Sequence, residues 1–332
     1  MLKLYEKILD YLKQNIKFFI FLIILFFVCT IELPFYIDTP GGLLDVSTRV
    51  EMDGYESKGS FNLAYVSELK ATIPTFIYAL LDKDWDILPK KEVVAENTNV
   101  EEIEYRNHLL LEESKQNAII VGFEKAGEYY EITNRNVNIV YIYEEADTDL
   151  MVSDEIIKVN DNIIYNKEDV LKYINESSDE VKFTVINDGK EYKRYANKVM
   201  VDGSKLVGIV VSETKEVDTN KEVNFKFRPS ESGPSGGFMM ALSIYNYLIE
   251  EDLTNGLKIV GTGTIDESGN VGSIGGIEYK IKAAVKEKAD LFFAPSANYE
   301  EAKQAVLEND LDIELISVSH IDEAIDYLVN IK

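Results

Sequence analysis

The chain has 332 residues, a length that favours two or three domains over one, and 46% of its residues are apolar, enough to form packed cores. Its formal net charge is −25, whereas a surface that binds nucleic-acid phosphates needs positive charge. The composition therefore argues against a disordered chain and against a protein that binds nucleic acid.

Cysteine and histidine are too few for several common kinds of site. Cys29 is the single cysteine, so an internal disulfide and a CxxC metal site are impossible. His108 and His320 are the two histidines and lie far apart in the sequence, which makes a zinc site and a Ser-His catalytic pair poor hypotheses. We therefore expect no metal and no other cofactor, and a catalytic base would have to be another side chain.

An uncharged apolar run, residues 18–31, follows the first 17 residues. The run is shorter than the roughly 20 residues that a membrane span needs, but Lys17 and the segment 33–37 can extend the span to residues 18–37. A cleaved signal peptide, a lipoprotein attached at Cys29 and a buried core helix are the alternatives. An uncleaved anchor is favoured because no A-x-A-like cleavage site follows the run and bulky residues precede Cys29.

The charges around this segment predict its orientation. Four lysines precede it, and acidic residues follow it before the next cation, Arg49. Because basic residues favour the cytoplasmic side, we expect residues 1–17 in the cytoplasm and the rest of the chain outside a cell membrane that it crosses once. The residues concerned are Lys3, Lys7, Lys13 and Lys17 before the segment, and Glu32, Asp38 and Asp45 after it.

Residues 38–132 are expected to form a membrane-proximal extracellular region without a readable function. Pro40-Gly41-Gly42 predicts a break in the chain. Residues 58–68 alternate between apolar and polar in the manner of a strand, and segments 75–82 and about 90–116 look helical.

Residues 133–200 follow the order strand, strand pair, helix and hairpin. The turns are predicted at Asn160-Asp161-Asn162 and Asp188-Gly189, and Asn166 is the expected N-cap of the helix. This order resembles a bacterial PDZ domain, in which a Gly-Asp pair usually stands where this chain has Ser153-Asp154. The resemblance implies binding of extended peptides at an open sheet edge, and a purely structural spacer is the alternative.

Residues 201–332 alternate strands and helices, and they contain no GxxxxGK[ST] motif that would bind ATP. A strand, EVNFKF, precedes the turn Gly233-Pro234-Ser235-Gly236-Gly237, and a helical run, FMMALSIYNYLIEE, follows it. Ser235 thus lies at a helix start, where free backbone N–H groups stabilise negative charge. Gly236 allows close approach of a substrate. An ordinary serine N-cap is the commoner explanation of such a residue taken alone.

A second motif lies downstream in GTGTIDESGNVGSIGGIEYKIKAAVKEKADLFFAP, residues 261–295. Together the two motifs resemble the proteolytic domain of Lon, and specifically the membrane-anchored Lon-like peptidases with a PDZ domain of Gram-positive bacteria. The resemblance implies that Ser235 is the nucleophile and Lys280, 45 residues later, its catalytic partner. It also implies that Thr262 hydrogen-bonds the lysine. Two positions depart from the family, which often has alanine at Gly236 and an acidic residue at Ser232.

A lysine can serve as the base if its pKa falls towards neutrality. Lys280 would lie in the first turn of a helix, at the border of the apolar face formed by Ile277, Ile281, Ala284 and Val285, where the helix dipole and burial both disfavour its charge. Lys282 and Lys286 are expected to point to solvent. The backbone N–H groups of Ser235 and Gly236 are the expected oxyanion donors.

The sequence therefore predicts an α+β multidomain chain that acts as an ATP-independent serine endopeptidase on exported peptides or on extracytoplasmic parts of envelope proteins. Its partners would be a peptide or protein substrate and membrane lipid, and the resemblance implies a homo-oligomer, commonly a ring of six. The alternative is a non-catalytic, membrane-anchored PDZ scaffold that binds peptides.

Overall fold

The computed structural model describes residues 5, 10–93, 99–201 and 204–331. The chain divides into two compact units: unit 1 comprises residues 1–41 and 66–96, and unit 2 comprises residues 42–65 and 97–332. Two strands, β1 (Glu32–Asp45) and β3 (Ser60–Thr72), contribute residues to both units. The expected separate region of residues 38–132 is therefore not one body, because its parts belong to different units.

Unit 1 contains the N-terminal helix and a small antiparallel pairing. In that pairing, Phe35 of β1 lies opposite Pro89 and Asp38 lies opposite Asp86. Strand β1 runs through Pro40-Gly41-Gly42 without interruption, so the predicted break does not end the strand, but the boundary between the two units falls between Gly41 and Gly42. The elements of this unit are α2 (Ile16–Thr30), the first part of β1, the last part of β3, α3 (Ile73–Ala79), β4 (Asp86–Pro89) and α4 (Lys90–Val93).

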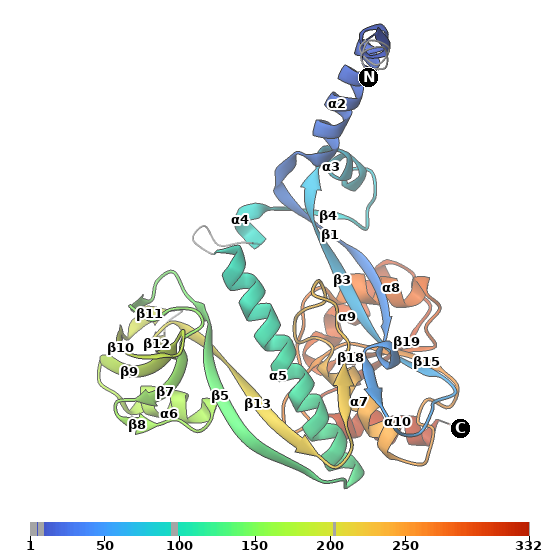
Figure 1. Ribbon diagram of the computed structural model, residues 1–332. Coiled ribbons are helices and arrows are strands. Elements are labelled where there is room, and N and C mark those ends of the chain that lie inside the picture. The colour runs from blue at the N-terminus through green and yellow to red at the C-terminus, as the bar shows by residue number, and fades with distance from the viewer. Residues whose placement is uncertain (1–4, 6–9, 94–98, 202–203, 332) are drawn as a thin grey trace. The chain divides into compact units, whose positions relative to one another are not determined.

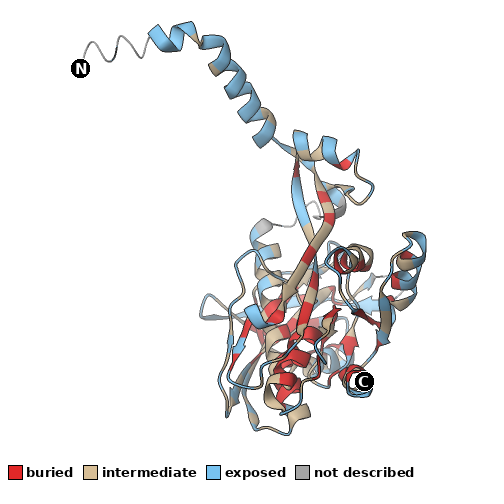
Figure 2. Ribbon diagram, turned by 90° about the vertical axis from the view of Figure 1, so that its right-hand side faces the viewer, coloured by how far each residue is buried: buried red, intermediate tan, exposed pale blue. Residues whose placement is uncertain are grey.

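The expected anchor differs from the structure at its C-terminal end. Helix α2 ends at Thr30, and Leu33 to Ile37 form part of strand β1 instead of extending the helix. Helix α2 buries none of its residues, and Figure 2 shows it exposed along nearly its whole length. Within the part of the chain that the structure describes, no helix combines the length and the apolar character that crossing a membrane requires.

Unit 2 contains an antiparallel sheet, which includes the region expected to be PDZ-like, with strand order β13-β5-β7-β9-β10-β6. Its long pair, β5 (Tyr130–Ile142) and β13 (Ile209–Thr219), is antiparallel and lies at one edge of the sheet (Figure 1). The sheet thus extends beyond the predicted limits of residues 133–200. Its other strands are β6 (Asp147–Thr148), β7 (Glu155–Val159), β9 (Glu180–Asn187) and β10 (Lys190–Asn197); β8 (Asn162–Ile163) pairs with β7, and β11 (Val199–Val201) pairs with β12 (Ser204–Leu206).

Local features of this region agree with the sequence. The turn residues Asn160, Asp161 and Asp188 all have positive φ, which is typical of tight hairpin turns. The Asn166 side chain accepts a hydrogen bond from Asp169 N and caps α6 (Lys167–Glu176). Ser153, which the expected resemblance to a PDZ domain places at a glycine position, has φ +79°, a conformation that favours glycine.

The rest of unit 2 is built on a parallel arrangement in the order β19-β18-β15-β3. Ser60 to Leu63 of β3 pair with Lys258 to Gly261 of β15, so a segment far upstream completes the C-terminal fold. The elements are β15 (Lys258–Gly261), β16 (Thr264–Ile265), β17 (Val271–Gly272), β18 (Leu291–Pro295), β19 (Glu314–Val318), α7 (Gly237–Leu248), α8 (Ile277–Lys286), α9 (Tyr299–Glu308) and α10 (Ile321–Asn330), with the short pair β2 (Val50–Met52) and β14 (Val223–Phe225).

Helix α5 (Val100–Ala126) packs against α7 and beside β13 (Figure 1). Gly122 permits this close packing, because a Cβ atom there would lie 2.6 Å from Ile244 Cγ2. The predicted helix of residues 90–116 is instead two helices, and part of that prediction, residues 94–98, lies outside the described residues. Helix α5 ends ten residues later than expected, at Ala126, where Gly127 in the left-handed conformation caps it.

Candidate active site

Ser235 lies in a turn that leads into α7. Gly233 has φ +92°, and Gly236 is the N-cap of the helix, so Ser235 precedes the first helical residue by two positions. A Cβ atom at Gly236 would lie 2.8 Å from Leu63 Cδ2 of β3. Leu63 thus occupies the space that a Cβ atom at position 236 would need, so an alanine there would require the Leu63 side chain to move.

Hydrogen bonds hold the two carbonyl groups on either side of this serine. The Pro234 carbonyl accepts from Ser114 Oγ of α5 at 3.0 Å and from Gly237 N at 3.2 Å. The Ser235 carbonyl accepts from Gly263 N at 2.8 Å and from Thr262 Oγ1 at 3.2 Å. The turn is therefore attached both to α5 and to the segment that follows β15.

The backbone N–H groups of Ser235 and Gly236 are the donors predicted for an oxyanion. Neither donates a hydrogen bond to any residue that the structure describes. Two adjacent N–H groups without a protein acceptor, at the start of a helix, form a site that favours an anionic oxygen.

Lys280 lies in the first turn of α8, one turn after the left-handed N-cap Gly276. The lysine side chain is surrounded by the apolar face of the helix, since Ile277, Ile281 and Ala284 are fully buried, and only 4% of Lys280 is exposed. Burial lowers the pKa of Lys280 from 10.5 to about 8 because an ammonium ion loses its hydration there. A considerable fraction of the amine is therefore neutral near pH 8.

Thr262 connects the lysine to the serine. Lys280 Nζ donates to Thr262 Oγ1 at 3.1 Å, and Thr262 Oγ1 donates in turn to the Ser235 carbonyl. Thr262 is fully buried at the carboxyl end of β15, where open parallel sheets commonly place their functional groups. The hydrogen bond predicted between Thr262 and Lys280 is present.

The structure brings Ser235, Gly236, Thr262 and Lys280 together, although the serine hydroxyl itself makes no hydrogen bond to another described residue. Catalytic hydrogen bonds often tighten only when substrate is bound. The link between the serine and the lysine in this state runs through Thr262.

The remaining candidate side chains lie elsewhere. Lys286 is exposed as expected, but Lys282 is not simply solvated: its side chain is 12% exposed and pairs with Glu278 at 2.7 Å. His108 is exposed on α5, and His320 is the N-cap of α10, where its side chain accepts from Asp322 N. Among the residues described, no group of three or more histidine, cysteine, aspartate or glutamate side chains is arranged to hold a metal ion.

Sequence reasoning missed the contribution of α5. Ser114 and Asn117 are both buried on this helix; the first binds the Pro234 carbonyl and the second donates to the Ile265 carbonyl at 2.9 Å. Both residues, with Pro234, Thr264 and Val271, line a cavity of about 280 Å³ beside the Ser235 turn. No motif marked these positions, because buried polar residues of a helix carry no signal of which distant segment they contact.

Comparisons with known proteins agree with this geometry. Residues 216–330 match the Lon protease (S16) C-terminal proteolytic domain. The chain is 31% identical over 144 residues to Lon protease 2 of Bacillus subtilis, an alignment that covers 42% of this chain and 25% of the relative. It is 35% identical over 115 residues to the archaeal Lon protease of Methanocaldococcus jannaschii, covering 33% of this chain and 17% of the relative.

A third relative, the Lon protease of Nitratidesulfovibrio vulgaris, is 30% identical over 122 residues, which cover 37% of this chain and 14% of that protein. The chain thus spans a quarter or less of the length of these relatives. The similarity lies in the part of the chain that carries Ser235, Thr262 and Lys280. Residues 216–330 of this chain therefore match a serine peptidase domain of the Lon type.

Proposed function

We propose that the protein is an ATP-independent serine endopeptidase in which Ser235 is the nucleophile and Lys280 the general base. The observation that carries this proposal is the buried Lys280 amine, which has a lowered pKa and is joined through Thr262 to the Ser235 carbonyl. Serine needs such a base, and a lysine that is neutral near pH 8 can act as one.

In this mechanism the neutral Lys280 amine takes the proton from Ser235 Oγ as the oxygen attacks the carbonyl carbon of the scissile peptide. The N–H groups of Ser235 and Gly236 stabilise the resulting oxyanion. The protonated lysine then donates its proton to the leaving amine, and the neutral amine later activates the water that hydrolyses the acyl-enzyme. Thr262 orients the amine through the hydrogen bond to its Oγ1. The cavity beside Pro234 supplies a place for a substrate side chain.

A serine-reactive fluorophosphonate probe and an unfolded protein substrate such as casein test this proposal without added nucleotide. The wild-type chain should be labelled and should cleave, whereas Ser235→Ala should do neither. Ser232→Ala is a matched control, because Ser232 lies exposed three residues earlier in the same turn. Cleavage or labelling retained by Ser235→Ala would exclude this nucleophile. If cleavage required ATP, the proposal that the peptidase is ATP-independent would be wrong.

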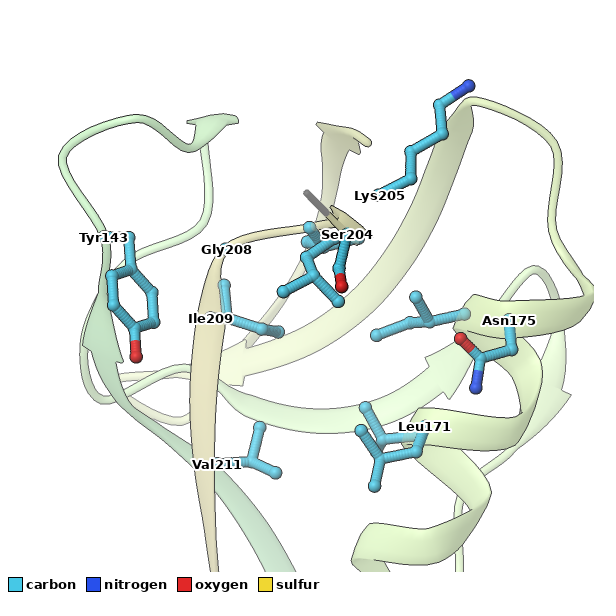
Figure 3. Close-up of a pocket in the computed structure, with 12 residues that line it drawn as sticks. Tyr143, Leu171, Asn175, Ser204, Lys205, Gly208, Ile209 and Val211 are labelled. Atoms are coloured by element: carbon cyan, nitrogen blue, oxygen red, sulfur yellow. The ribbon is translucent and has the colours of Figure 1, made fainter. Parts of the chain in front are cut away.

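A second function, peptide binding by the PDZ-like region, is favoured by a cavity of about 260 Å³ between α6 and the start of β13 (Figure 3). Leu171 and Asn175 of α6 face Ile209 and Val211 of β13 across this space. Strand β13 is an edge strand, so an extended peptide can add to it while an apolar side chain enters the cavity. We propose that this groove presents substrate to the peptidase domain.

The groove is tested with fluorescent peptides that carry apolar side chains. Leu171→Glu places a charge in the groove and should weaken binding at least tenfold, and Leu307→Glu should leave it unchanged, since Leu171 and Leu307 are both exposed leucines on helices. Equal peptide affinities in the two variants would mean that this groove is not the peptide-binding site. A chain that bound peptides but was neither labelled nor active would instead be the non-catalytic scaffold.

We further propose that the N-terminal segment attaches the chain to a membrane and that the peptidase acts on exported peptides or extracytoplasmic protein segments. Support comes from the exposed apolar side chains of α2, including Phe18, Phe21 and Phe26, and from the lysines that precede them. The full chain should float with lipid vesicles, whereas a chain that lacks residues 1–31 should not. Sedimentation of the detergent-solubilised chain tests whether it forms the expected homo-oligomer of six.

A further inference from the structure

The turn that carries Ser235 depends on a residue outside the matched Lon domain. Ser114 lies on α5, 120 positions before Pro234, and its side chain is almost fully buried, with 3% of the residue exposed. A buried hydroxyl that lost its acceptor would cost stability, and among the described residues the Ser114 hydroxyl donates to the Pro234 carbonyl, at 3.0 Å.

This carbonyl belongs to the same planar peptide unit as the N–H group of Ser235. A hydrogen bond to the oxygen of that unit fixes the direction in which its N–H points, and it also polarises the N–H bond. The Ser235 carbonyl is held in the same manner by Gly263 N and Thr262 Oγ1, and it belongs to the unit that carries the Gly236 N–H. Each of the two N–H groups therefore lies on a peptide whose oxygen accepts two hydrogen bonds.

The glycine at position 237 is part of this arrangement. A Cβ atom there would lie 2.5 Å from Ser114 Oγ, closer than two such atoms can approach. Gly237 consequently leaves the space through which the Ser114 hydroxyl reaches the Pro234 carbonyl. The second glycine of the Gly-Gly pair thus serves the contact with α5, while the first accommodates Leu63.

From this geometry we propose that Ser114 is a positioning residue of the peptidase, which acts through the Pro234–Ser235 peptide to orient one of the two oxyanion donors. The proposal rests on the proposed function, because it takes Ser235 as the nucleophile. Ser114 touches neither the reacting atoms nor Lys280. Asn117, one turn further along α5, braces the neighbouring β16 through the Ile265 carbonyl, so the same helix face holds both segments.

Ser114→Ala tests the proposal by steady-state kinetics on a peptide substrate. We expect kcat to fall by about 10- to 100-fold, less than the 10²- to 10³-fold loss typical when a donor itself is removed. KM should stay within about twofold, because the ground-state carbonyl uses this donor less than the oxyanion does. A peptide boronate, whose tetrahedral adduct resembles the oxyanion, should bind more weakly by a similar factor to the loss in kcat.

The comparison with other variants separates positioning from folding and from cavity lining. Ser114→Thr keeps a hydroxyl and should recover part of kcat, whereas Ser114→Cys, a weak donor of similar size, should not. Ser243→Ala removes another buried hydroxyl, on α7, and should leave kcat unchanged. If Ser114→Ala does not fold, Ser114→Cys provides the same measurement.

Two results would overturn this assignment: an unchanged kcat, or a raised KM at unchanged kcat, which would mean that Ser114 only lines the cavity. The midpoint of the pH–rate profile should be the same in the wild-type and Ser114→Ala enzymes, and a displaced midpoint would mean that Ser114 acts on the base instead. A wild-type chain that neither cleaves nor is labelled at Ser235 would instead overturn the proposed function together with this inference.

Discussion

Two lysines of unit 2, Lys280 and Lys215, are buried to a similar degree in different surroundings. Lys215 of β13 has its Nζ 3.3 Å from Glu213 Oε1, 3.8 Å from Glu267 Oε2 and 2.9 Å from Asn117 Oδ1. Lys280 of α8 lies among apolar residues, and in the described part of the chain its Nζ has the hydroxyl of Thr262 as a partner but no carboxylate within 4.0 Å.

This difference in surroundings gives the two lysines different roles: Lys215 is suited to a structural ion pair, and Lys280 is suited to proton transfer. A buried ammonium next to carboxylates exchanges its hydration for opposite charge, whereas one without such a partner favours the neutral amine. The Lys215 network joins three elements, because Glu213 also accepts from Lys167 N at the start of α6 and Arg135 pairs with both Glu213 and Glu267. Lys280 joins no ion pair, and its burial is instead reflected in a pKa of about 8.

Replacement of Lys280 should have the largest of the expected effects, a loss of catalytic activity. Lys280→Met removes the base, and kcat/KM should fall by about 10³-fold or more, as is typical when a group of a catalytic unit is lost. Lys282→Met is the matched control, since Lys282 lies two residues further along the same helix, and it should retain activity within about threefold. Peptide hydrolysis measures both, and an active Lys280→Met enzyme would contradict the assignment of the base.

Replacement of Glu213 should affect stability most. Glu213→Ala leaves Lys215 and Arg135 without their shared carboxylate and the start of α6 without its acceptor, so the free energy of unfolding should fall by about 3–5 kcal/mol. Glu216→Ala, at an exposed position of the same strand, should change it by no more than about 0.5 kcal/mol. Urea denaturation gives both values; similar losses in the two variants would mean that the network is not stabilising.

The stability of the wild-type chain should depend on pH through Lys280. Because its pKa is 10.5 unfolded and about 8 folded, the unfolded state binds more protons between these values, and the stability contributed by this group rises with pH across that window. The group therefore destabilises the fold by about 3 kcal/mol at pH 7. Denaturation at pH 7.5 and pH 10 should give a higher free energy of unfolding for Lys280→Met than for the wild type, and the difference should shrink as pH rises. A difference that stayed constant would contradict the lowered pKa of Lys280.

The smallest expected effect concerns the pH dependence of catalysis. The free base is the active form of Lys280, so kcat/KM should rise about tenfold between pH 7 and pH 9, following a group of pKa about 8, and then level off. Initial rates at saturating and subsaturating substrate give the profile. A flat profile across this range, or a midpoint near 10.5, would mean that the lysine is not held in the surroundings described.

Part of the fold could be predicted because it is encoded by neighbouring residues. The helices that follow Ser235 and contain Lys280, the hairpin turns at Asn160 and Asp188 and the Asn166 cap were all correctly predicted from periodicity and turn chemistry. The break predicted at Pro40-Gly41-Gly42 coincides with the boundary between the two units but not with a turn, because strand formation overrides the local preference of these residues for turns.

The candidate site was predictable only for the residues that lie in its two motifs. Ser235, Gly236, Thr262 and Lys280 could be named, but the contributions of Leu63 and Ser114 could not, because each comes from an element far upstream that β3 pairing and α5 packing bring to the turn. Lys282 was expected in solvent, and its pairing with Glu278 depends on side-chain packing that periodicity does not describe.

The sequence by itself argued against a Ser-His pair, since its two histidines lie far apart, and the resemblance of its two motifs to the Lon proteolytic domain named Ser235 and Lys280 as the reacting groups. Only the tertiary structure decided the state of that lysine. Lys280 and Lys215 are the same residue type, and their different chemistry arises from which groups the fold places around each amine: apolar side chains and one hydroxyl around the first, carboxylates and an amide around the second. Desolvation and charge pairing are properties of three-dimensional surroundings, so they cannot be read from local sequence.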